Sequence, residues 1–201
     1  MTYRSVREDT IKIGQGLLDL WNWRTGHVLA IVAPNCLQYT TMIFSTLWAG
    51  GTIAAINPLG TLDEIVSQLK SCGARAVATD ASMYAKVVQA AMKAGIPASK
   101  VIVMEGDVSG GTSLASLKQH NSTSQRPQLR PDSDLAFLVF SSGTTGLPKG
   151  VMLSHRNFVA NIIQVAVMDQ ENTTWQRDRA LGFLPMYHIY GTFRSYLPVC
   201  L

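Results

Sequence analysis

The sequence lacks the features of secreted, membrane-spanning and polyanion-binding proteins. Its most apolar stretch, Met42–Ile56, is interrupted by glycine and threonine and is shorter than the roughly 18 residues of a membrane span. The first residues, MTYRSVREDTIKIGQG, carry charges and have no apolar centre, so we predict no secretory signal peptide. No run of consecutive lysine or arginine accompanies the net charge of +4, and we expect no nucleic-acid partner.

Cysteine is also scarce. The three cysteines, Cys36, Cys72 and Cys200, lie far apart and match neither a C-x-x-C motif nor a metal-ligand spacing. A reducing compartment is the simplest interpretation, so we expect an intracellular protein, cytoplasmic or peroxisomal, with no metal held by a cluster of side chains.

Turn signals separate segments of alternating strand and helix character, which predicts an α/β fold with parallel-rich sheets flanked by helices. The predicted strands are His27–Ala33, Thr52–Ile56, Ala76–Thr79, Lys100–Met104, Asp134–Phe140 and Ala180–Leu184. The predicted helices follow Asn35 as far as Trp48, open at Thr61 with a capping box, and span Ala81–Lys93, Ser113–His120 and Phe158–Val167. We expect the polar stretch Gly106–Pro131 to be a surface connection inside a single incomplete domain, residues 1–201.

The most informative segment follows the apolar strand Asp134–Phe140. Residues Ser141–Gly150 (SSGTTGLPKG) hold three glycines, four hydroxyl side chains and one lysine. Glycine lets backbone N–H groups approach a ligand, hydroxyls add donors, and lysine adds a positive charge. Such a loop at the carboxyl end of a strand suits a polyphosphate.

Two alternatives compete with this interpretation. A Walker A loop requires G-x-x-x-x-G-K-[ST], but Pro148 stands where its second glycine belongs and Gly150 follows Lys149. A flexible surface loop explains most segments of this composition. The ordered Gly-x-x-Gly-x-Pro-Lys-Gly pattern directly after a buried strand favours the phosphate-binding interpretation over both.

The segment FSSGTTGLPKGVMLSH, Phe140–His155, closely resembles the phosphate-loop signature of the adenylate-forming superfamily. That superfamily includes acyl-CoA synthetases, 4-coumarate-type ligases, beetle luciferases and peptide-synthetase adenylation domains. Asn35–Pro58 and Leu184–Gly191 (LPMYHIYG) agree with the same family in order and spacing. The form of the latter segment is most similar to the CoA ligases of aryl and fatty acids.

The resemblance implies a two-step reaction with ATP, Mg²⁺ and CoA. A carboxylate and ATP give an acyl-adenylate and pyrophosphate, and the acyl group then passes to a thiol, usually that of CoA. By this resemblance Lys149 counters the charge of the departing pyrophosphate, and the phosphates themselves hold most of the Mg²⁺ coordination. The residues expected to cradle the phosphates are Ser141, Ser142, Gly143, Thr144, Thr145 and Gly146.

The resemblance also places His188 between the acyl pocket and the nucleotide, as an orienting group and not a general base. Tyr190 is the one aromatic residue that we assign to the acyl pocket. Met186 and Tyr187 are as well explained by core packing.

Family motifs expected downstream, including the segment with the catalytic lysine of the C-terminal domain, have no counterpart before Leu201. Two hypotheses therefore stay open. The chain is the N-terminal part of an ATP-dependent acid–thiol ligase, or it is a truncated, catalytically silent fragment that binds at most a nucleotide or a partner. On either hypothesis we expect the 201-residue chain alone to be inactive.

Overall fold

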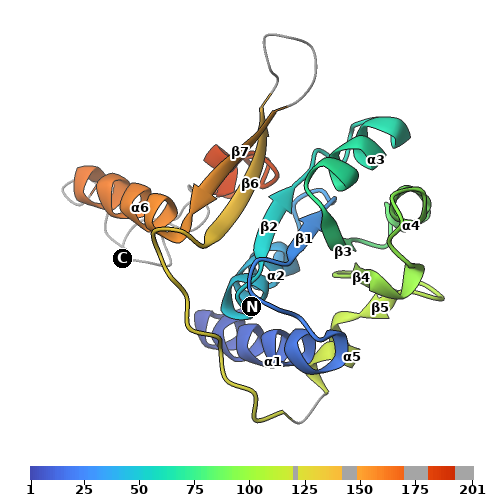
Figure 1. Cartoon of the computed structure of the whole chain (residues 1–201), viewed down its shortest axis with the longest axis horizontal. Helices are drawn as coiled ribbons and strands as arrows, with labels where there is room; N and C mark the ends of the chain where they lie inside the picture. The colour runs from blue at the N-terminus through green and yellow to red at the C-terminus, as the bar shows by residue number, and fades with distance from the viewer. Residues whose placement is uncertain (120–121, 142–148, 170–180, 193–201) are drawn as a thin grey trace.

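The computed structural model describes residues 1–119, 122–141, 149–169 and 181–192, which form a mixed α/β structure around one sheet (Figure 1). Its seven strands lie in the order β5-β4-β3-β1-β2-β6-β7, and all neighbours are parallel except β6 and β7. The strands are β1 (Val28–Ile31), β2 (Thr52–Ala55), β3 (Ala74–Thr79), β4 (Val101–Val103), β5 (Thr112–Ser113), β6 (Leu135–Ser141) and β7 (Lys149–Ser154). The predicted fold class is confirmed.

Helices cover both faces of the sheet. They are α1 (Tyr3–Trp21), α2 (Leu37–Trp48), α3 (Leu62–Ser71), α4 (Tyr84–Lys93), α5 (Leu114–Lys118) and α6 (His155–Asp169), with a 3₁₀ turn at Ala98–Lys100. Buried side chains of α3 and α4 pack on one face, and those of α1, α2, α5 and α6 pack on the other. No helix in the described ranges is long and apolar enough to cross a membrane.

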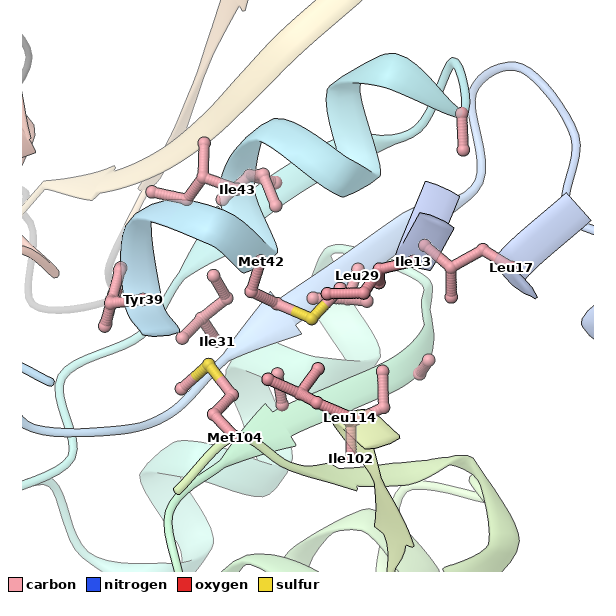
Figure 2. Close-up of a cluster of buried hydrophobic side chains, with 14 of the residues drawn as sticks. Ile13, Leu17, Leu29, Ile31, Tyr39, Met42, Ile43, Ile102, Met104 and Leu114 are labelled. Carbon is pink, nitrogen blue, oxygen red and sulfur yellow. The ribbon is translucent and has the colours of Figure 1, made fainter. Parts of the chain in front are cut away.

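The central strands are apolar on both sides because each face meets a helical layer. Along β1, Leu29 and Ile31 face the layer of α1 and α2, whereas Val28 and Ala30 face α3 and α4. This alternation is the two-residue period of a strand. Figure 2 shows the first of these clusters, where α1, α2 and α5 close over the sheet.

The helix α3 begins as the sequence predicts. Thr61 accepts a hydrogen bond from the backbone N–H of Glu64, and the Glu64 carboxylate accepts one from the N–H of Thr61. These reciprocal bonds satisfy two backbone donors that the first turn of a helix leaves free. The predicted capping box is therefore confirmed, as are the two strands that flank this helix.

The stretch Gly106–Pro131 contains more structure than a surface connection. Residues of α5 occupy the predicted helical segment, and Leu114 and Leu117 are buried against α1. A methyl group on Gly16 of α1 would lie 2.5 Å from the carbonyl oxygen of Leu117, so the two helices are in close contact. Further along, Ser124 hydrogen-bonds to α1 through Asp19 at 2.5 Å.

Several differences separate the sequence-based expectations from the structure, among them the short strand β5, which was not predicted. The first helix, α1, was not predicted, although Thr2 and Ser5 form a capping box at its start. The strand β7 was also not predicted. The predicted strand Ala180–Leu184 is wrong for its described part, because residues 181–184 pair with no strand.

Phe137 is the side chain whose loss should cost most at the junction of β6 and α6. It is 1% exposed and stacks on Phe158 with ring centroids 4.6 Å apart. We expect Phe137→Ala to lower the free energy of unfolding by about 3–5 kcal/mol, because it removes buried area and leaves a cavity. Urea denaturation measures this change.

The matched control is Phe183→Ala, since Phe183 is 71% exposed. Exposed truncations usually change stability by less than about 0.5 kcal/mol. Equal losses for the two variants would contradict the packing described for β6.

Candidate functional site

The predicted phosphate loop connects the two strands of an antiparallel hairpin. Ser141, the last residue of β6, pairs directly with Lys149, the first residue of β7, and Phe140 pairs with Gly150. Seven residues, 142–148, lie between these paired ends. The hairpin thus fixes both ends of the loop and holds the exposed Ser141 and Lys149 opposite one another.

The hairpin is mounted on the central sheet through β2. The last register pair between these two strands joins Ala55 to Val139, so β6 continues past β2 toward the loop, as Figure 1 shows. At the other end of the strand, the Thr52 hydroxyl donates a hydrogen bond of 3.0 Å to the carbonyl oxygen of Leu135. The loop is therefore carried beyond the carboxyl edge of the parallel strands, where ligands bind in open α/β sheets.

The helix that follows the hairpin, α6, also begins at a capping arrangement. The N–H of Asn157 donates to the Ser154 hydroxyl oxygen at 3.2 Å, and the N–H of Ser154 donates to Asn157 Oδ1 at 3.1 Å. Phe158 follows directly and stacks on Phe137 of β6. The predicted helix Phe158–Val167 is confirmed as part of α6, which packs behind the hairpin.

A second polar element at the same edge is the side chain of Asn35, four residues after Ile31, the last residue of β1. Its Nδ2 donates to the carbonyl oxygen of Leu184 at 2.8 Å, and its Oδ1 accepts from the N–H of Met186 at 2.8 Å. A longer bond of 3.4 Å reaches the carbonyl oxygen of Gly182. One amide thus ties residues 182–186, about 150 positions away in the chain, to the end of a central strand.

The segment that carries His188 and Tyr190 is a tight turn that leads into a helical stretch, residues 189–192, and the Asn35 amide fixes its start. Met186 is 6% exposed and its carbonyl oxygen accepts a bond of 2.6 Å from the Thr192 hydroxyl. Gly191 has no room for a side chain, because a methyl group there would clash with the backbone of Pro185. The turn leaves His188 and Tyr190 exposed, with the His188 ring beside that of Tyr187 at 4.5 Å.

Each predicted site residue has a definite status. Four of them are described and exposed: Ser141, Lys149, His188 and Tyr190. All four lie beyond the carboxyl edge of the sheet. Within the described residues, neither His188 nor Tyr190 bonds to Ser141 or Lys149. The remaining predicted phosphate ligands lie outside the described residues: Ser142, Gly143, Thr144, Thr145 and Gly146.

Two buried groups near the turn lack hydrogen-bond partners in the described structure. The Tyr39 hydroxyl at the start of α2 is one, and burial raises the pKa of this phenol, with Cys36 and Tyr187 adding smaller effects. The Oε1 of Gln38 is the other. Burial likewise raises the pKa of the neighbouring Cys36 thiol to about 11, so this cysteine is a neutral thiol at physiological pH.

His155 belongs to the structural support and not to the phosphate loop. It begins α6 at the end of β7 opposite the loop, and its backbone N–H donates to the carbonyl oxygen of Asp134. Its Nε2 is buried without a hydrogen-bond partner in the described structure. Burial lowers the pKa of the imidazole, and the negative charge of Asp134 raises it by a smaller amount.

The donor set of the site suits a phosphate better than a metal ion. The described loop residues offer a hydroxyl and an ammonium group, which recognise anions. Among the described residues, no three histidine, cysteine, aspartate or glutamate side chains lie close enough to hold a metal.

The comparison with known proteins decides the family. The family model described as AMP-binding enzyme matches residues 1–201. The chain belongs to the AMP-binding enzyme family. This membership confirms the resemblance that the phosphate-loop segment, Asn35–Pro58 and Leu184–Gly191 carry in the sequence.

Individual members of the AMP-binding family agree with this assignment. The chain is 36% identical to a 4-coumarate–CoA ligase-like protein of Arabidopsis thaliana, over 95% of this chain and 34% of the relative. A long-chain-fatty-acid-CoA ligase from Archaeoglobus fulgidus superposes with a TM-score of 0.83 at 27% identity, over 98% of this chain and 38% of that one. ATP-bound MatB from Rhodopseudomonas palustris superposes with a TM-score of 0.78 at 26% identity. That match covers 97% of this chain and 37% of MatB. The chain spans about a third of the length of the curated relatives it matches.

Sequence reasoning missed Asn35 as a site residue of this AMP-binding protein. The residue opens the segment Asn35–Pro58 that resembles the family, and the pair Pro34-Asn35 marks a turn after a strand. Nothing in that local pattern shows that the amide anchors a segment almost 150 residues further along.

We expect Asn35→Ala to loosen the turn that carries His188 while leaving the global fold intact. The variant removes the acceptor for the N–H of Met186 and the donor to Leu184. At about 1 kcal/mol net for each bond, exchange of the Met186 amide hydrogen should become about tenfold faster or more. Native-state hydrogen exchange measures it.

Asn57→Ala is the matched control. Asn57 follows β2 at the same edge and caps only its own turn, by accepting from the N–H of Leu59. Unchanged Met186 exchange in Asn35→Ala would show that the amide does not hold the turn.

Asp134 makes the base of the hairpin sensitive to acid. The backbone N–H of Arg130 donates to its carboxylate at 2.7 Å and holds the pKa of Asp134 below its usual range, with a further contribution from the Arg130 guanidinium. A carboxyl group with a lowered folded-state pKa stabilises the fold above its unfolded pKa of about 3.9, and this stabilisation is lost as the pH falls through the folded value. Asp134→Asn should therefore be less stable than the parent at pH 7, and the difference should shrink below about pH 4.

Urea midpoints at a series of pH values test this, with Asp107→Asn as the control at an exposed carboxylate. A difference between Asp134→Asn and the parent that stays constant from neutral to acid pH would contradict the assignment.

Proposed function

We propose that this chain supplies the phosphate-binding part of an ATP-dependent acid–thiol ligase, as an incomplete N-terminal AMP-binding domain. The observation that carries the proposal is the pairing of Ser141 with Lys149, which closes a Ser/Thr/Gly loop beyond the carboxyl edge of a parallel sheet. Relatives named as CoA ligases and an ATP-bound structural neighbour support the same chemistry.

In the proposed first step, a carboxylate oxygen attacks the α-phosphorus of ATP. The bond between the α-phosphorus and its bridging oxygen breaks, and pyrophosphate leaves. Because two anions must meet, positive charge and in-line positioning are the main requirements. Lys149 would neutralise charge on the pyrophosphate while Ser141, Ser142, Gly143, Thr144, Thr145 and Gly146 hold its oxygens by hydroxyl and backbone N–H groups.

In the proposed second step, the CoA sulfur attacks the acyl carbon and AMP leaves. Asn35 acts here as a positioning residue, since it fixes the turn that presents His188 and Tyr190. His188 would orient the acid between the nucleotide and the acyl pocket, and Tyr190 would contact the acyl group. Met186 is 6% exposed and packs in the core, which fits the packing interpretation of this residue. An aryl or fatty acid is the proposed substrate class.

Exposed apolar side chains among the described residues fit a partial domain under either hypothesis, the ligase part or the silent fragment. They include Met152 of β7 (67% exposed), Ile163 of α6 (57%) and Leu181 (82%). We therefore expect the 201-residue chain alone to catalyse no reaction.

ATP–pyrophosphate exchange tests the proposal in the native polypeptide that contains this sequence, with a panel of aryl and fatty acids. Lys149→Ala should lower the exchange rate by about a hundredfold or more, because it removes the charge opposite the leaving pyrophosphate. Lys149 is exposed, so we expect the substitution to leave the stability of the fold nearly unchanged.

Lys12→Ala, at an exposed position on α1, is the control and should leave exchange unchanged. Full exchange in Lys149→Ala would remove the proposed role of the loop. A native polypeptide of about 21.9 kDa without exchange toward any acid would favour the silent fragment.

A further inference from the structure

A pocket of about 800 Å³ lies at the edge of the sheet opposite the phosphate loop. Its walls come from the residues that precede or begin β1, β3 and β4 and from the ends of α1, α3 and α4. We call it the amino-edge pocket and define it by Trp21, Arg24, His27, Lys70, Arg75 and Lys100. His27 precedes β1 and Asn35 follows it, so the strand separates this pocket from the site described above.

The charge of the amino-edge pocket is unbalanced. Arginine and lysine contribute four positive side chains to its lining, which contains no aspartate or glutamate. None of these four forms an ion pair with another described residue. The positive charges also affect His27. Burial lowers the pKa of its imidazole most, and the charges of Arg75 and Arg24 lower it further. Four like charges around one hollow repel each other unless an anion joins them.

Helix dipoles explain only part of this grouping. Cations at helix C-termini are common because they meet the negative end of the dipole, and Lys70 in the last turn of α3 fits that pattern. Arg24 lies between α1 and β1, and Arg75 lies on β3. Neither belongs to a helix, so their convergence needs another cause.

Parts of the amino-edge pocket are already ordered for binding. Lys100 Nζ lies 4.1 Å from the centroid of the Trp21 ring, a cation–π contact that restrains the long side chain. The N–H of Arg24 donates to His27 Nδ1 at 3.2 Å, so the neutral imidazole carries its hydrogen on Nε2 as a donor. Trp23, 4% exposed, holds the His27 ring in an edge-on contact at 5.4 Å.

We propose that the amino-edge pocket binds a phosphorylated small molecule, at a site separate from the phosphate loop. Arg24 and Arg75 supply the planar forks that match phosphate oxygens, while Lys70 and Lys100 add compact charges. A volume of about 800 Å³ is within the range of small-molecule sites and holds a nucleotide-sized ligand. This site does not depend on the proposed ligase activity.

Inorganic tripolyphosphate is the probe, and tryptophan fluorescence of the 201-residue chain at low micromolar concentration is the measurement. Trp21 and Trp23 line the pocket, and the variant Trp21→Phe separates their signal from that of Trp48 and Trp175 elsewhere in the chain. We expect a saturable fluorescence change that Trp21→Phe reduces. The double variant Arg24→Ala/Arg75→Ala should raise Kd at least about tenfold, because it removes half of the permanent charge.

Two controls decide between sites. Arg4→Ala/Arg7→Ala removes the same charge from exposed positions on α1 outside the pocket and should leave Kd within about twofold. Lys149→Ala should also leave it unchanged. The proposal is overturned if no saturable signal is seen up to about 10 mM probe, or if Arg24→Ala/Arg75→Ala binds like the parent. It is also overturned if Lys149→Ala abolishes the signal. Far-ultraviolet circular dichroism checks that each variant is folded.

Discussion

The pairing of β6 with β2 is the contact on which the arrangement of the candidate site depends. Ile53 of β2 pairs with Phe137 of β6, and both are buried beneath helices. Through this register the hairpin is attached to the doubly covered sheet, and the predicted phosphate loop starts at a position that the sheet determines. A phosphate loop needs a defined position because preorganised donors stabilise charge without further reorganisation.

The same sheet edge also receives the second half of the site, but by a different kind of contact. The turn with His188 and Tyr190 belongs to no strand, so no ladder of hydrogen bonds sets its position. The Asn35 amide takes over that role by bonding on both sides of Pro185. Because β2 alone stands between β1 and β6, the Asn35 turn and the hairpin emerge close together from one edge.

Sequence reasoning found the elements whose patterns are local. The strand β1 and the capping box at Thr61 carry their signals within a few residues, and both are confirmed. The strand β7 was missed because Lys149-Gly150 belongs to the loop motif and its next residues face outward, so no buried period appears. Helix α1 was missed because a largely polar sequence shows its buried stripe, Ile13 and Leu17, only against partners elsewhere in the chain.

Contacts between distant segments set the remaining features, and no local pattern encodes them. The Asn35 contacts join positions about 150 residues apart, and the amino-edge pocket collects side chains from three separate stretches of the chain, 21–27, 69–75 and 94–100. The predicted strand Ala180–Leu184 shows the converse error. Its short apolar run has strand composition, yet an amide from another segment already binds the carbonyl oxygens of Gly182 and Leu184.

Helix α6 has an exposed apolar face that the additional length of the relatives can explain. Phe158 and Ile162 pack toward the sheet, whereas Val159, Ile163 and Val167 form an exposed apolar stripe at four-residue spacing. A helix that is apolar on both sides fits a place between two packed layers, not at a surface. The relatives have about two thirds of their length outside the matched region, which is ample for such a second layer. The exposed stripe is therefore explained as an interface within the proposed whole enzyme.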